Sequence, residues 1–304
     1  MIPRTLIGEL TQLLSEYPVI TLVGPRQAGK TTLAKTLEAY DYCNLELPEN
    51  REFALSDPKT FLSRFPDKVI LYEIQLLPEL LSYIQVMVDD DKRLGRFILT
   101  GSNQLALKQS ITQSLAGRTA ILNLLPLSIA ELSAANLTFE RFENYAFHGF
   151  LPRVYDVGQR PRQAYSNYYQ TYVERDVKLL VNLKDASLFE KFMKLLAGRV
   201  GQLMDYTSLA NDVGVDAKTI RHWLSVLESS FIVYRLPPYF ENFGKRVIKS
   251  PKYYFLETGL LVYLLGINQA DQISRDPLVG AIFENLVVVE FLKDRYNKGE
   301  AANI

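Results

Sequence analysis

The sequence has one cysteine and two histidines, and this scarcity excludes several kinds of site. Cys43 alone cannot form an internal disulfide, which fits a reducing compartment. The same scarcity leaves too few ligands for a zinc centre built from cysteine and histidine. The longest strongly apolar run near the end of the chain, residues 259–267, is far below the roughly 18 residues of a membrane-spanning helix. We therefore expect a cytoplasmic protein with no membrane segment.

The chain also lacks an excess of charge of either sign. Its 304 residues include 34 lysines and arginines and 34 aspartates and glutamates, so the net charge is zero. This balance gives no global signal for nucleic acid or a membrane surface, and any basic surface must be local. A hydrophobic fraction of 48% is enough for well-packed cores, and the length favours two domains over one.

The most informative pattern is the run GPRQAGKT, which fits the phosphate-binding loop G-x-x-x-x-G-K-[ST]. It follows an apolar, β-branched stretch at 19–23 and precedes a stretch with helical character at 32–38, which is the context that the motif requires. Lys30 would reach the β- and γ-phosphates of a nucleoside triphosphate, and the Thr31 hydroxyl would hold Mg²⁺. Backbone N–H groups beside the glycines would bind the remaining phosphate oxygens. The predicted nucleotide contacts are Gly24, Pro25, Arg26, Gln27, Ala28, Gly29, Lys30, Thr31 and Thr32.

Four further strands are expected, at 42–47, 68–73, 96–100 and 119–124. In enzymes with such a loop, the third strand ends in an acidic residue that holds Mg²⁺, and here it ends in Tyr72-Glu73. Glu73 is the candidate for activating the attacking water. Tyr72 cannot supply an anionic ligand at neutral pH, because the pKa of tyrosine is about 10. Either Glu46 or a water compensates for the missing aspartate, or hydrolysis is impaired.

Two more positions are candidates for contact with the terminal phosphate. Ser102, or its neighbour Asn103, follows the strand at 96–100 and could touch the γ-phosphate or the water, although a plain turn would also explain them. Arg118 precedes the strand at 119–124, and an arginine near a transferring phosphate stabilises developing charge. The alternative for Arg118 is an ordinary surface arginine.

The segment 189–255 has the order of a winged helix: helix, helix, Gly214 turn, helix and two strands. The hydroxyl of Thr207 is expected to cap the helix before the turn. Basic residues on the exposed side of the following helix and at the wing tip suit DNA phosphates, although such modules also contact proteins. The DNA-contact candidates are Lys218, Arg221, Lys245, Arg246 and Lys249.

A helix rich in tyrosine is expected at 165–177, packed by its ring faces. A second long helix is expected at 280–292. Its apolar residues lie nearly all round, so we expect it to be buried.

Together these stretches resemble the prokaryotic AAA-type ATPases that join a P-loop domain to a C-terminal domain of unknown function. The resemblance implies an α/β fold with parallel strand order 5-1-4-3-2, a helical linker, a winged helix and the start of a nuclease-like fold. It also implies ATP and Mg²⁺ as ligands, with roles for Lys30, Thr31, Glu73 and Arg118. The segments that carry it are GPRQAGKTTL, Glu73-Ile74-Gln75 with LLPELLSYIQ, TGS, SLAGR, YVERDV, YYFLETGL and FENLVVVEF.

The chain departs from this family in three ways. Tyr72 and Glu257 stand where family members usually have aspartate, and the strands that would carry nuclease motifs after the last helix are absent. Glu284 and Glu290 alone cannot form a two-metal nuclease site. We therefore expect a truncated or degenerate C-terminal region without nuclease activity.

The sequence predicts a P-loop ATPase domain at 1–150, a helical linker at 151–188, a winged helix at 189–255 and a partial C-terminal region at 256–304. The first functional hypothesis is an ATPase whose nucleotide state moves the winged-helix part. The alternative is a nucleotide-dependent module that binds DNA or protein with little or no hydrolysis, because Tyr72 replaces the aspartate. A homo-oligomer is compatible with either hypothesis.

Overall fold

The computed structural model describes residues 1–101, 111, 114–177, 186–239 and 250–302. The chain forms two compact units. The first, named here the sheet unit, comprises Arg4–Leu125 and Arg295–Ala301. The second, named the helical unit, comprises Met1–Pro3, Pro126–Asp294 and Ala302–Ile304. The finer four-part division made from the sequence stays a prediction.

The sheet unit contains a five-stranded parallel sheet with the order β2-β3-β4-β1-β5. This is the order 5-1-4-3-2 read from the other edge, so the predicted α/β fold class and strand order are confirmed. All five residues of β1 are buried, and β4 and β5 flank this strand on both sides. The strands are β1 (Val19–Val23), β2 (Asp41–Asn44), β3 (Val69–Tyr72), β4 (Phe97–Gly101) and β5 (Thr119–Asn123).

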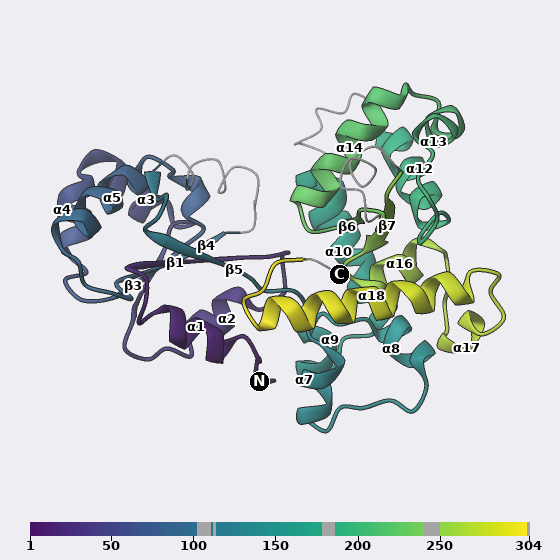
Figure 1. The fold of residues 1–304 in the computed structure, drawn as a ribbon, viewed down its shortest axis with the longest axis horizontal. Coiled ribbons are helices and arrows are strands. Elements are labelled where there is room, and N and C mark those ends of the chain that lie inside the picture. The colour runs from purple at the N-terminus through teal and green to yellow at the C-terminus, as the bar shows by residue number, and fades with distance from the viewer. Residues whose placement is uncertain (102–110, 112–113, 178–185, 240–249, 303–304) are drawn as a thin grey trace. The chain divides into compact units, whose positions relative to one another are not determined.

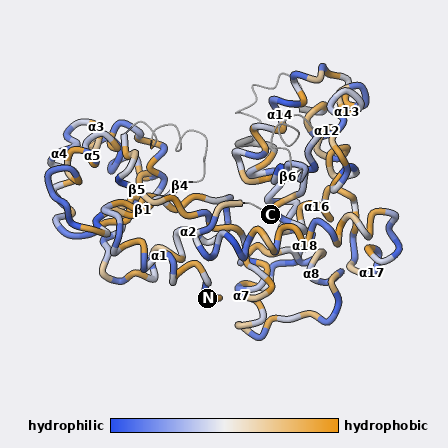
Figure 2. Tube along the Cα trace, viewed as in Figure 1, coloured by the Kyte–Doolittle hydropathy of each residue, from blue (hydrophilic) through white to orange (hydrophobic). Residues whose placement is uncertain are grey.

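Helices cover both faces of this sheet (Figure 1). On one face, α1 and α2 pack leucines such as Leu10 and Leu33 against Ile20 and Leu22 of β1. Helices α3, α4 and α5 lie on the other face. Strands β1 and β4 are mostly hydrophobic along their length (Figure 2), as expected for strands covered on both faces. The helices of this unit are α1 (Ile7–Leu13), α2 (Lys30–Ala34), α3 (Pro48–Ser56), α4 (Pro58–Ser63), the 3₁₀ helix η1 (Ile74–Leu76) and α5 (Leu80–Asp90).

Helix α3 was not expected from the sequence. The strand expected at 42–47 ends at Asn44, and Pro48 is the first residue of the helix that follows. Proline suits this position, because its fixed φ matches the helix and its missing N–H would have no helical partner there.

The helical unit contains eleven helical segments and a two-stranded antiparallel sheet among its described residues. The helix expected at 165–177 is helical throughout, with a change from α to π geometry after Tyr168. The elements are α7 (Ile129–Ala134), α8 (Phe142–His148), α9 (Pro152–Asp156), α10 (Pro161–Tyr168), η2 (Tyr169–Val177), α12 (Ala186–Ala197), α13 (Tyr206–Val213), α14 (Ala217–Ser229), β6 (Val233–Leu236), β7 (Lys252–Phe255), α16 (Thr258–Leu264), α17 (Ala270–Ile273) and α18 (Val279–Asn297).

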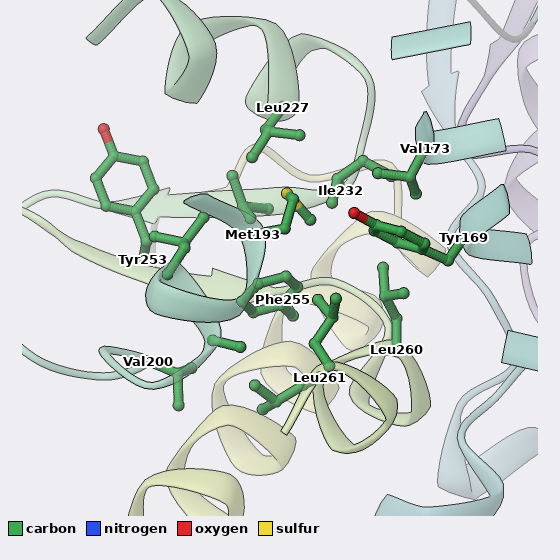
Figure 3. Close-up of a cluster of buried hydrophobic side chains, with 14 of the residues drawn as sticks. Tyr169, Val173, Met193, Val200, Leu227, Ile232, Tyr253, Phe255, Leu260 and Leu261 are labelled. Atoms are coloured by element: carbon green, nitrogen blue, oxygen red, sulfur yellow. The ribbon is translucent and has the colours of Figure 1, made fainter. Parts of the chain in front are cut away.

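One large hydrophobic core joins most of these elements. Figure 3 shows its centre, where Met193 of α12, Leu227 of α14 and Phe255 of β7 lie among side chains from η2 and α16. The buried tyrosines of η2 belong to this core. The ring of Tyr172 packs edge to face against that of Tyr168 at the end of α10, with 5.3 Å between the ring centroids. The tyrosine-rich segment is therefore packed by its rings, as expected.

Helices α12, α13 and α14 and the hairpin β6–β7 occupy the segment in which a winged helix was expected. The predicted cap of α13 was wrong: the Asp205 carboxylate, not the Thr207 hydroxyl, precedes the helix and accepts hydrogen bonds from the N–H groups of Thr207 and Ser208. A carboxylate can accept both bonds and is favoured by the helix dipole.

Helix α18 is buried on one side only, so the expectation of burial all round was wrong. Phe283 is 48% exposed and Phe291 is 62% exposed, and both line a hollow of about 490 Å³. On the buried side, the Asn285 amide accepts from the Phe255 N–H at 2.7 Å and donates to the Phe255 carbonyl at 3.0 Å. This side chain thus pairs with the backbone of β7 in the manner of a neighbouring strand.

Within the described ranges, no helix is both long and apolar enough to span a bilayer.

Candidate functional site

The loop 24–31 lies at the carboxyl end of β1 and leads into α2, as the motif predicted. Gly24 must be glycine, because a Cβ there would lie 2.1 Å from the backbone oxygen of Leu124. Gly29 caps α2 with a φ of +94°, a left-handed conformation that glycine adopts without strain. Both glycines of the motif are therefore required by local geometry. Thr32 lies in the first turn of α2 and is exposed.

Lys30 is buried at the centre of the loop. Its ammonium donates to the backbone oxygens of Gly24 at 2.8 Å and of Pro25 at 2.7 Å. Burial lowers the pKa of Lys30 from about 10.5 to about 8; the charge of Glu73 opposes this shift, and that of Arg26 adds to it. Phosphate oxygens would replace the two carbonyls as partners of Lys30, so this loop conformation must open for the lysine to act as predicted.

Arg4 holds the loop from its other side, and sequence reasoning missed it. Its guanidinium is buried and donates to the backbone oxygens of Ala28 and Leu125, both at 2.6 Å. No motif could have identified this residue. The only signal in the sequence is an arginine placed just before an amphipathic helix.

Tyr72 and Glu73 lie near the loop, at the carboxyl end of β3. Burial, followed by the charges of Glu73 and Glu46, raises the pKa of the Tyr72 hydroxyl to about 12, and the neighbouring Thr31 side chain opposes this rise. The phenol is therefore neutral at physiological pH. Glu73 is buried, has a φ of +58° and accepts a hydrogen bond from the Gln75 amide. Its carboxylate is close enough to Lys30 to influence that pKa. The structure thus brings Lys30, Thr31, Tyr72 and Glu73 together.

The donor set around Thr31 only partly fits Mg²⁺. This ion is usually held by one or two carboxylates together with substrate phosphates and water. Here a neutral phenol occupies the position expected for the carboxylate, beside the Thr31 hydroxyl that would bind the ion. Nowhere in the described ranges do three or more His, Cys, Asp or Glu side chains gather as a possible metal site.

Arg118 lies at the opposite edge of the sheet, so the prediction that it acts at this site is corrected. Its carbonyl accepts from the N–H of Val19 at the amino end of β1, whereas the loop follows the carboxyl end of that strand. The Arg118 guanidinium binds both oxygens of Asp89, at 2.6 and 2.8 Å, and this pairing raises the pKa of the arginine. The interpretation as a surface arginine with an ion pair fits this geometry.

Two further polar groups near the loop were not identified from the sequence. Thr100 and Asn123 stand at the carboxyl ends of β4 and β5, paired in register with Leu22 and Val23 of β1. The Thr100 hydroxyl and the Asn123 side-chain oxygen are buried without a hydrogen-bond partner in the described part of the chain. Strand register, which a motif does not contain, places them beside the loop.

The remaining candidates are only partly described. Lys218, Arg221 and His222 are exposed on α14, as expected, and the Arg221 guanidinium lies 4.7 Å from the ring centre of Tyr206. Contact with DNA stays a prediction. Ser102, Asn103, Lys245, Arg246 and Lys249 lie outside the described residues.

Comparisons with known proteins agree with this architecture. Residues 16–133 match the family model of an AAA domain, and residues 139–271 match a domain of unknown function, DUF8612. Uncharacterized proteins of Mycobacterium tuberculosis and Mycobacterium bovis are each 33% identical over 292 residues, which cover 94% of this chain and 64% of theirs. An uncharacterized protein of Haemophilus influenzae is 26% identical over 214 residues, covering 66% of this chain and 52% of its own. The chain thus spans less than two thirds of the length of these relatives.

Among solved structures, a Walker-type ATPase of Pyrococcus abyssi is similar, with a TM-score of 0.55 and 16% sequence identity. The match covers 87% of this chain and 96% of that protein. This likeness shows a P-loop ATPase fold, which agrees with the AAA-domain match at 16–133.

Proposed function

We propose that the sheet unit binds ATP with Mg²⁺ at residues 24–32 and hydrolyses it. The observation that carries this proposal is the position of Lys30, whose ammonium is buried inside a glycine loop and held only by the backbone oxygens of Gly24 and Pro25 among its described hydrogen bonds. A buried ammonium is stabilised strongly by an anion in place of neutral carbonyls. A triphosphate placed on the loop is such an anion.

In this proposal each residue of the site has a separate task. Lys30 offsets the charge of the β- and γ-phosphates, the backbone N–H groups of 24–31 bind their oxygens, and Glu73 polarises the attacking water. Mg²⁺ bound with the triphosphate would neutralise its charge, with the Thr31 hydroxyl as the ligand that the chain offers. Arg118 has no part in this site.

The nucleotide state would be transmitted to a winged-helix module made of α12, α13, α14, β6 and β7. The helix order, the turn at Gly214 and the antiparallel hairpin support this assignment. Lys218 and Arg221 are exposed on α14 and offer the module cationic groups for DNA phosphates or for an acidic protein surface. A homo-oligomer is part of the same proposal.

A second function is favoured by the position of Tyr72 beside Thr31. Because a neutral phenol stands where a carboxylate would bind Mg²⁺, the site is suited to holding ATP with little turnover. The chain would then be a nucleotide-dependent binding module whose state changes when ATP binds.

Measurement of ATP binding and phosphate release by the native chain and by Lys30→Ala separates these functions. The first function predicts ATP-dependent phosphate release that Lys30→Ala abolishes. The second function predicts that the native chain binds ATP and that Lys30→Ala does not. It also predicts that the native chain releases phosphate no faster than this variant does. Absence of ATP binding by the native chain would refute both.

A salt titration of DNA binding tests the winged-helix module. If Lys218 and Arg221 contact phosphates, Lys218→Ala and Arg221→Ala each reduce the slope of log affinity against log salt by about one. An absence of DNA binding at low salt would leave a protein as the partner of this module.

A further inference from the structure

Arg4 occupies a special position in the chain. The chain passes from the helical unit into the sheet unit at Pro3–Arg4, first leaves it at Leu125–Pro126, and returns to it for Arg295–Ala301. Arg4 is thus the first residue of the sheet unit, and Leu125 is the last residue of its main segment. The guanidinium of Arg4 donates to the Leu125 carbonyl, so the side chain joins these two points within the sheet unit.

The same guanidinium also binds the phosphate loop. One nitrogen donates to the backbone oxygen of Ala28 and the other to that of Leu125, each at 2.6 Å. A guanidinium is planar and holds its N–H groups in a fixed fork, so it fixes the distance between the two carbonyls. Hydrogen bonds from a charged donor are about twice as strong as neutral ones, and they offset the cost of burying the charge.

Leu124 contacts the start of the loop, and Leu125 is linked through Arg4 to a residue near its end. The Leu124 N–H donates to the Val23 carbonyl at 2.8 Å, and the Leu124 oxygen lies against the bare Cα of Gly24. Leu125 is tied through Arg4 to Ala28, near the other end of the loop. A rearrangement of the loop would therefore act directly on Leu125, the last residue of the main segment of the sheet unit.

Such a rearrangement is required if the site acts as proposed. The Lys30 ammonium must leave the carbonyls of Gly24 and Pro25 to meet phosphate oxygens. We propose that Arg4 is a positioning residue that couples this opening of the phosphate loop to Leu125, the last residue of the main segment of the sheet unit. The proposal rests on ATP binding at the loop, and it adds the route by which the bound state reaches the rest of the chain.

Hydrogen–deuterium exchange of the whole chain tests this coupling. Two peptides are followed, one covering the loop at 22–31 and one covering 121–130, without nucleotide and with a non-hydrolysable ATP analogue. The variants are Arg4→Ala, Arg4→Lys, which keeps the charge without the fork, and Arg64→Ala as a control at an exposed arginine of the same unit.

Without nucleotide, both peptides exchange about tenfold faster in Arg4→Ala than in the native chain, because hydrogen bonds from a charged donor are lost. Arg64→Ala behaves as the native chain does. With the analogue, the native chain shows slower exchange in both peptides, whereas Arg4→Ala and Arg4→Lys respond in the loop peptide alone. If Arg4→Ala does not fold, Arg4→Lys serves for the comparison.

The coupling would be overturned if the analogue slowed exchange of peptide 121–130 in both Arg4 variants as much as it does in the native chain. Unchanged exchange of both peptides in the nucleotide-free variants would overturn it equally. If the loop peptide of the native chain does not respond to the analogue, ATP binding itself fails. The nucleotide-free comparison then still decides whether Arg4 joins the loop to Leu125.

Discussion

The hydroxyl of Tyr72 lies beside the side chain of Thr31, the residue that the loop motif assigns to Mg²⁺. Burial and two nearby carboxylates, those of Glu73 and Glu46, raise the pKa of Tyr72 to about 12, and the Thr31 side chain opposes this rise. The tyrosine therefore stays neutral at the place where a carboxylate was expected. In the proposed function, this pair would slow any step that depends on Mg²⁺.

Tyr72→Asp is expected to raise the rate of Mg²⁺-dependent ATP hydrolysis by about tenfold or more, because the new carboxylate would help to hold the metal, and a bound metal stabilises the transition state by several kcal/mol. Phosphate release at saturating ATP and Mg²⁺ measures this effect. Tyr72→Phe is the matched control, since it removes the hydroxyl beside Thr31 without adding a charge, and it should give a smaller increase in rate than the aspartate variant. Equal rates in the native chain and in Tyr72→Asp would show that the tyrosine does not limit turnover.

The affinity for ATP should fall as the pH rises above about 8. The pKa of Lys30 in the nucleotide-free chain is lowered by burial to about 8, and a bound triphosphate would raise it again. ATP binding then takes up a proton, and the affinity falls by up to about tenfold per pH unit above that value. The terminal phosphate, with a pKa of about 6, is already ionised in this range.

Calorimetric titrations with ATP between pH 7 and pH 10 would measure the dependence on pH. Lys30→Arg provides the comparison, because arginine stays charged over the whole range and should bind with an affinity that does not change. A native affinity that is constant over this range would contradict proton uptake by Lys30.

Gly24→Ala should destabilise the folded chain by about 2–3 kcal/mol, because the new methyl group would lie 2.1 Å from the backbone oxygen of Leu124 and the backbone must move. Gly8→Ala is the control. Gly8 lies in α1 with no atom within 4 Å of the added Cβ, so alanine should stabilise the helix by up to about 1 kcal/mol. Urea unfolding of both variants gives the two free energies, and similar values would refute this account of the loop.

Glu257→Gln should remove a pH dependence of stability. Oε1 of Glu257 accepts from the Phe150 N–H and the Tyr165 hydroxyl at 2.9 Å, and Oε2 is buried without a partner in the described chain. Burial raises the pKa of this carboxyl, with Lys293 opposing the shift. The folded chain therefore binds the proton more tightly than the unfolded chain does. The contribution to stability is complete below the unfolded pKa, about 4.3, and is lost as the pH rises through the folded pKa.

The measurement is the difference in the free energy of unfolding between the native chain and Glu257→Gln from pH 4 to pH 8. Titration of the other groups cancels in this difference, which should decline with pH. Glu140→Gln changes an exposed glutamate and should show no such trend. A flat difference for Glu257→Gln would contradict a raised pKa.

Much of the site could be predicted because its parts are close together in the sequence. The loop 24–31, its strand and its helix form a local unit, and Glu73 was found from its position at a strand end. Helix α3 was missed because Pro48 is compatible with both the end of a strand and the start of a helix, and the choice depends on packing against α4 and the sheet. Burial of α18 was also overestimated, because it too depends on tertiary packing. A helix with apolar residues on every side buries only the side that packs against a partner.

By itself, the sequence determined the phosphate loop and the neutral residue at the metal position, because glycine spacing and side-chain identity act at a single place in the chain. Only the tertiary structure decided which charged side chains reach that loop. Arg4 reaches it through Ala28, 24 residues away, whereas Arg118 is at the other edge of the sheet. Strand direction and register decide this difference, because they fix which ends of the strands lie together.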